Sequence, residues 1–159
     1  MDDLIPLAQC EPAAVLALNN RNARELSWLD EAGLAHLVHE AFLAVATGPL
    51  HGVLIAFDQD AVYDSPNFLW FRDRLQRFVY VDRIVIDESA RGRGLARRLY
   101  EHLFTAARAA GHERVCCEVN AQPPNPASDA FHAALGFSEI GSATLAGGAK
   151  TVRYFVRTL

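Results

Sequence analysis

The chain has 159 residues, of which 51% are hydrophobic and 21% charged, so it is long and apolar enough to form one compact domain over residues 1–159. Its formal net charge of −4 disfavours a partner with a phosphate backbone, and we expect no nucleic-acid binding. The three cysteines, the acidic N-terminus and the lack of a long apolar run favour a cytoplasmic protein without disulfides, a secretion signal or a membrane partner.

The first half of the chain predicts three helices and a hairpin. Residues 12–20 and 28–40 have apolar residues at helical spacing, and residues 41–47 and 52–57 are short apolar runs typical of strands. The Gly-Pro pair between these runs favours a hairpin. Ser65 followed by Pro66 predicts the start of a short helix, with Ser65 as its cap.

The second half predicts strands and helices in alternation. Residues 78–87 and 114–119 are predicted strands, and leucines at positions 95, 99 and 103 place a helix over residues 93–110. A further helix is expected over residues 125–135, followed by strands over 138–145 and 150–157. Because strand, helix and strand follow one another over residues 78–119, we expect a parallel pair within a mixed sheet, which makes the fold α/β.

The segment from Arg91 to Ala96 (RGRGLA) lies between the end of a predicted strand and the start of a predicted helix. Glycines allow close approach of the backbone to a ligand, and a helix start carries a partial positive charge, so this loop predicts a phosphate site. It does not fit two known phosphate loops. A dinucleotide fingerprint needs a third glycine where Arg97 stands, and a P-loop needs a Gly-Lys-Ser/Thr ending.

Four arginines lie in the eight-residue stretch 91–98, which includes this loop: Arg91, Arg93, Arg97 and Arg98. On charge alone they would form a solvated helix face. The protein would then be an interaction domain with a basic helix surface. However, cations are disfavoured at a helix N-terminus unless an anion offsets them, so a bound pyrophosphate is the alternative.

These residues resemble the signature of the GNAT acetyltransferase superfamily, which reads Arg or Gln, two residues, Gly, one residue, and Gly or Ala. RGRGLA matches every position, and the preceding Ile84-Val85-Ile86-Asp87 is similar to the strand that pairs with the pantetheine arm in that family. The segment from Asn125 to Phe137 is similar to its second motif, except that His132 stands where a Tyr is usual.

The resemblance implies the GNAT fold: a mixed, mostly antiparallel sheet of six or seven strands with a splayed parallel pair, flanked by four or five helices. It implies acetyl-CoA as co-substrate and no metal. Backbone groups of Ile84, Val85 and Ile86 would hold pantetheine. The loop and helix start would hold the pyrophosphate, and Asn125 and Ser128 would touch the pantetheine arm. The loop and helix-start residues are Arg91, Gly92, Arg93, Gly94, Leu95, Ala96 and Arg97.

The implied activity is transfer of an acetyl group to a primary amine, of a small molecule or a peptide, by direct attack through a tetrahedral intermediate. His132 is the candidate for protonating the departing thiolate, because an imidazole can donate a proton near neutral pH. Glu118 and Asp82 are candidate bases, and an ion pair with Arg83 or Arg114 is the structural alternative for each. The loss of the usual Tyr keeps open a non-catalytic CoA-binding or regulatory module.

The acceptor is left open by the sequence. The aromatic segment from Tyr63 to Phe71 follows Asp58 and Asp60 and would suit a cationic amine, although Trp70, Phe71 and Leu75 also read as the buried side of a helix. Many proteins of the fold pair through sheet edges, so a homodimer is an expectation that no residue here tests.

Overall fold

The computed structural model describes residues 3–23, 26–121, 124–148 and 150–159. Its strands are β1 Leu4–Pro6, β2 Leu43–Thr47, β3 Gly52–Asp58, β4 Val79–Ile86, β5 Arg114–Asn120, β6 Ser138–Leu145 and β7 Lys150–Thr158. Its helices are α1 Pro12–Arg21, α2 Glu31–Glu40, α3 Pro66–Arg72, α4 Leu95–Ala109 and α5 Pro126–Ala134, with short 3-10 turns at Leu7–Gln9, Glu88–Ala90 and Ala146–Gly148.

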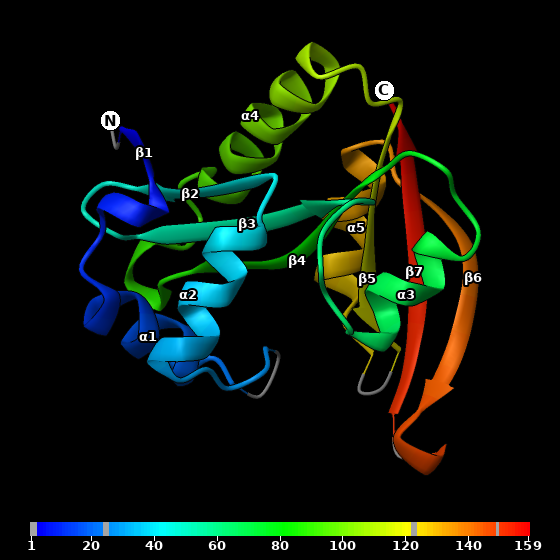
Figure 1. Ribbon diagram of the computed structural model, residues 1–159, viewed down its shortest axis with the longest axis horizontal. Helices are drawn as coiled ribbons and strands as arrows, with labels where there is room; N and C mark the ends of the chain where they lie inside the picture. Colours follow the sequence, from blue (N-terminus) through cyan, green and yellow to red (C-terminus); the bar gives the residue numbers. More distant parts are fainter. Residues whose placement is uncertain (1–2, 24–25, 122–123, 149) are drawn as a thin grey trace.

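In the described part of the chain, seven strands form one mixed sheet in the order β1-β2-β3-β4-β5-β7-β6. Only β4 and β5 are parallel, and they pair at two positions, Val79 with Val115 and Tyr80 with Cys116. Beyond Tyr80 the two strands separate, while β4 stays paired with β3 and β5 with β7. Figure 1 shows the result, with β2–β4 and β5–β7 running in different directions on the two sides of this gap. The predicted splayed pair is confirmed.

A β-bulge interrupts β4 where the strands part. Ile55 of β3 pairs with Arg83 and the next residue, Ala56, pairs with Val81, so Asp82 is the extra residue. A bulge changes the face to which the following side chains point. Tyr80 and Val85 therefore pack in the same core although they are five residues apart, and a regular strand would put them on opposite faces.

Two hydrophobic cores cover the two faces of the sheet. Buried side chains of α1, α2 and α3 form one with Phe57, Tyr80 and Tyr154, and those of α4 form the other with Val79 and Phe155. Figure 1 shows α4 on one side of β2–β4 and α1 and α2 on the other. The stripe predicted for the α4 segment is buried, and the cysteines at 116 and 117 are buried free thiols.

The structure corrects several predicted boundaries. The helix expected over 28–40 begins at Glu31, because the Asp30 carboxylate accepts from the Gly33 amide at 2.7 Å and caps it there. Ser65 does precede α3, but its side chain makes no capping hydrogen bond. The three-residue β1 was not predicted, since a strand so short leaves no periodic pattern. No helix among the described residues is long and apolar enough to cross a membrane.

Candidate active site

The RGRGLA loop forms a backbone cradle at the start of α4. Gly92 and Gly94 have φ values of 78° and 76°, and a Cβ at either position would meet no atom within 4 Å. The Arg98 amide donates to the Gly94 carbonyl at 3.1 Å, so the amides of the three residues before it have no acceptor within the helix. This geometry fits a diphosphate, which accepts hydrogen bonds from such amides and is stabilised by the helix dipole.

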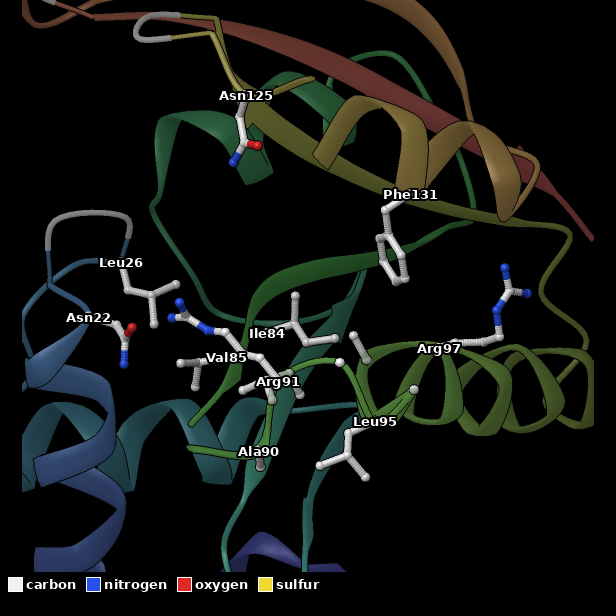
Figure 2. Close-up of a pocket in the computed structure, with 14 residues that line it drawn as sticks. Asn22, Leu26, Ile84, Val85, Ala90, Arg91, Leu95, Arg97, Asn125 and Phe131 are labelled. Carbon is white, nitrogen blue, oxygen red and sulfur yellow. The ribbon is translucent and has the colours of Figure 1, made fainter. Parts of the chain in front are cut away.

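The cradle opens into a pocket of about 670 Å³ that runs along the free edge of β4. In Figure 2, Arg91, Ile84 and Val85 lie on one side of the space, Asn125 and Phe131 on the α5 side, and Arg97 projects from α4. Ten of the twelve predicted cofactor-binding residues line it: Ile84, Val85, Ile86, Arg91, Gly92, Gly94, Leu95, Ala96, Arg97 and Asn125.

The other two predicted cofactor-binding residues lie elsewhere. The Arg93 guanidinium is 3.4 Å from the His51 ring, and Ser128 lines the next pocket along the gap. Asn125 is the N-cap of α5, and its side-chain oxygen accepts from the Ser128 amide at 3.1 Å. Its amide group is therefore left to face the pocket. The residues present fit a CoA-like molecule, with a phosphate cradle at one end and a strand edge beside it.

A second pocket of about 430 Å³ occupies the gap between β4 and β5 and contains Glu118. The Tyr80 hydroxyl donates to the Glu118 carboxylate at 2.7 Å, across the point where the strands part. Burial raises the pKa of Glu118 to about 7, and the nearby Asp82 charge adds to the shift, while hydrogen bonds from Tyr80 and Asn67 oppose it. Glu118 can thus exchange a proton near neutral pH.

His132 is buried in the same pocket, at 8% exposure, rather than on the outer side of α5. Its Nδ1 lies 2.7 Å from the Ser128 carbonyl oxygen, which can only accept, so Nδ1 carries a proton. Its Nε2 lies 3.3 Å from the hydroxyl of Tyr100 on α4. Burial lowers the pKa of His132, so the neutral ring accepts the Tyr100 hydrogen at Nε2. The sequence did not point to Tyr100.

Asp82 is held in a buried ion pair. Its carboxylate accepts from Arg83 Nε at 2.7 Å and from the Tyr63 hydroxyl at 2.6 Å, and both charged side chains are about 5% exposed. Arg83 also donates to the Asn19 side chain at 2.9 Å. The structural alternative for Asp82, a pair with Arg83, is therefore present, although it is buried rather than at the surface. Glu118 makes no ion pair with any described residue.

A third, polar pocket of about 240 Å³ adjoins the second, and both contain Asp82, Arg83, Glu118, Lys150 and Leu26. Leu26 also lines the first pocket, so it lies where all three meet. The remaining polar lining comes from Ser27 and from Tyr63, Ser65 and Asn67 at the start of α3.

The aromatic segment from Tyr63 to Phe71 contributes side chains both to the core and to the third pocket. Phe68 and Phe71 are fully buried, and Trp70 stacks on Tyr154 with the Arg74 guanidinium over its ring. Most of the segment is therefore core, and Tyr63 is its one aromatic residue in the third pocket. No group of three or more His, Cys, Asp or Glu residues placed to hold a metal occurs in the described ranges.

Residues 27–137 match the acetyltransferase (GNAT) family. The chain belongs to the GNAT family. It is accordingly an acyltransferase that uses acetyl-CoA as co-substrate. No curated protein sequence matches this GNAT chain.

Solved structures with the same fold include three GNAT-type enzymes. The ribosomal-protein-S18-alanine N-acetyltransferase from Escherichia coli is 19% identical, with a TM-score of 0.71 over 99% of this chain and 94% of that one. The putative acetyltransferase yncA from Salmonella typhimurium, solved with acetyl-CoA, is 16% identical with a TM-score of 0.74 over 100% and 94%. Arabidopsis thaliana NAA60, also solved with acetyl-CoA, is 15% identical with a TM-score of 0.73 over the full length of both chains. At sequence identities of 15–19%, the similarity between these structures and this chain is one of fold.

Proposed function

We propose that this GNAT protein transfers the acetyl group of acetyl-CoA to a primary amine, with Glu118 as the base. The observation that carries the proposal is the position of Glu118, a carboxyl with a pKa of about 7, in the gap between β4 and β5. The pocket that contains it shares Ile84 and Asn125 with the cofactor pocket. One similar structure is a ribosomal-protein-S18-alanine N-acetyltransferase, which supports an amine as the acceptor.

Glu118 removes the proton that an ammonium must lose before its nitrogen can attack the acetyl carbon. A base with a pKa near the working pH combines a large ionised fraction with enough basicity. Asp82 is less suited to this task, because Arg83 and Tyr63 already occupy its oxygens. We assign Asp82 to holding Arg83 and Tyr63 at the wall of the pocket.

Backbone amides along Ile84–Ile86 stabilise the oxygen that becomes negatively charged when the nitrogen–carbon bond forms. These residues line the cofactor pocket, and β5 has left their edge of β4 unpaired in the described part of the sheet. Fixed amide donors of this kind account for a large part of catalysis in acyl transfer. The Gly92 and Gly94 cradle holds the diphosphate and so sets the position of the thioester.

Breaking the carbon–sulfur bond leaves a thiolate that needs a proton. The Tyr100 hydroxyl supplies it: its hydrogen leaves the hydrogen bond to His132 Nε2 and passes to the sulfur, while His132 holds the phenol in place. The phenolate that this leaves takes the second proton that the acceptor nitrogen loses as the amide forms. His132 thereby takes part at the position of the usual family Tyr. His132→Ala should lower kcat, and unchanged turnover would remove His132 from this step.

Thiol release from acetyl-CoA, measured over a panel of primary amines, tests the function. We expect turnover on at least one amine, and a loss of about 10² to 10⁴-fold in kcat for Glu118→Gln. Tight CoA binding without turnover on any amine would instead favour the non-catalytic CoA-binding module. Calorimetry with CoA is the parallel measurement, because an interaction domain would not bind it.

A further inference from the structure

The third pocket contains more positive charge than a site for a simple amine needs. Among the residues that the structure describes, its charged lining comprises two acids, Asp82 and Glu118, and two bases, Arg83 and Lys150. Asp82 and Arg83 neutralise each other in their 2.7 Å ion pair. Of these four described side chains, one carboxyl, Glu118, and one ammonium, Lys150, are left without an ion pair.

Lys150 is the only lysine of the chain, and it makes no ion pair with a described residue. It begins β7 and lines both the second and the third pocket. In β7 it lies two and four residues before Val152 and Tyr154, which face the core of α1–α3, so strand alternation puts all three on one face. Glu118 pairs with Tyr154 in the neighbouring strand.

This register sets the distance between the two charges. Lys150 is four residues from the partner of Glu118, which corresponds to about 13 Å along the strand at about 3.3 Å per residue. Both side chains are long and extend into the same pocket of about 240 Å³, which has the volume of about eight water molecules. The space between their charged ends therefore suits a small molecule.

We propose that the acceptor is a small amine that also carries a carboxylate, an amino acid, whose amine meets Glu118 and whose carboxylate binds Lys150. This inference rests on the proposed function. A polyamine would find an unpaired cation at Lys150, and a peptide N-terminus would place a neutral amide there. Only an acceptor with both charges pairs with both residues. Lys150 is exposed and hydrated, so what it gains is a charge-assisted hydrogen bond to the carboxylate, while the half-buried Glu118 gains a partner for its charge.

The test compares matched acceptors. We measure kcat/KM by thiol release for the twenty amino acids and, for each, its carboxamide and its decarboxylated amine. The preference for the carboxylate form should fall about tenfold or more in Lys150→Met, mainly through KM, because a hydrogen bond to a charged group is lost. Lys150→Arg should keep most of the preference.

Arg153→Met is the matched control. It also removes one positive charge from β7, but Arg153 is paired with Asp129 and Glu139 and lines none of the three pockets. The carboxylate preference should be the same in this variant as in the unmodified protein. Since Lys150 is the sole lysine, reductive methylation, which keeps the charge, and acetylation, which removes it, give a second comparison without a change of sequence.

Two results would overturn the inference while the acetyltransferase function stands: equal kcat/KM for an amino acid and its decarboxylated amine, or an unchanged preference in Lys150→Met. If no amine is turned over, the proposed function fails. Calorimetry of amino acids with the CoA-loaded protein then decides the inference by itself. Binding that Lys150→Met weakens about tenfold supports it, and absent or unchanged binding contradicts it.

Discussion

Replacing Glu118 with Gln should stabilise the protein at alkaline pH while it removes activity. The pKa of Glu118 is raised from 4.5 to about 7, so the folded state holds its proton more tightly than the unfolded state does. The contribution of this group to stability is full below pH 4.5 and is lost as the pH rises through about 7. At about 1.4 kcal/mol per unit, the ionised carboxyl costs about 3 kcal/mol above pH 7.

Gln keeps the shape of Glu and can still accept the hydrogen bond from Tyr80, but it carries no charge to desolvate. At pH 8 the variant should therefore melt higher by up to about 6–12 °C, taking about 2–4 °C per kcal/mol for a chain of this size. This is an upper value, because the Glu118 residue is only partly buried and the pocket keeps some water at the carboxyl.

Thermal melts of both proteins from pH 4.5 to pH 8 provide the measurement, and pH itself is the control. The two melting curves should nearly coincide at pH 4.5, where Glu118 is protonated, and separate as the pH approaches 7. In parallel, kcat/KM of the unmodified enzyme should fall about tenfold per pH unit below 7. A difference in melting temperature that does not depend on pH, or an active Glu118→Gln variant, would refute the reasoning.

Three further predictions concern the cradle, the proton donor and the core. Gly94→Val should weaken CoA binding about tenfold, since φ is 76° and the new side chain enters the pocket. Gly147→Val, which has a similar φ of 65° but lines none of the three pockets described above, should leave the calorimetric Kd unchanged, and equal effects of the two substitutions would contradict the cradle. Tyr100→Phe removes the hydroxyl that donates the proton, so kcat should fall about 10²-fold while the Kd for CoA stays the same. An unchanged kcat would exclude the Tyr100 phenol as the proton donor. Gly141→Ala should reduce the free energy of unfolding by about 1–3 kcal/mol, because the new Cβ would lie 2.7 Å from the Trp70 ring, which stacks on Tyr154. A denaturant titration measures this, and an unchanged free energy of unfolding would mean that the ring moves freely.

The local elements and the shape of the glycine loop could be predicted from the sequence. The leucine spacing of α4, the apolar runs of β3 and β4 and the glycines of RGRGLA carry their signal within a few residues, because periodicity and backbone freedom are local properties. The order of strand, helix and strand predicted the parallel pair, and the family resemblance added that this pair is splayed. Ten of the twelve predicted cofactor residues line one pocket.

The chemistry of the gap was decided by tertiary structure. The bulge at Asp82 depends on pairing with β3, and it sets which of the β4 side chains reach the pocket. Tyr100 lies 32 residues from His132, and Lys150 lies 32 residues from Glu118, so neither pair leaves a pattern in the sequence. The raised pKa of Glu118 likewise requires the burial that only the packed strands provide. Sequence periodicity specifies which elements form, whereas proton transfer and charge recognition depend on distances between elements, which exist only after the chain has folded.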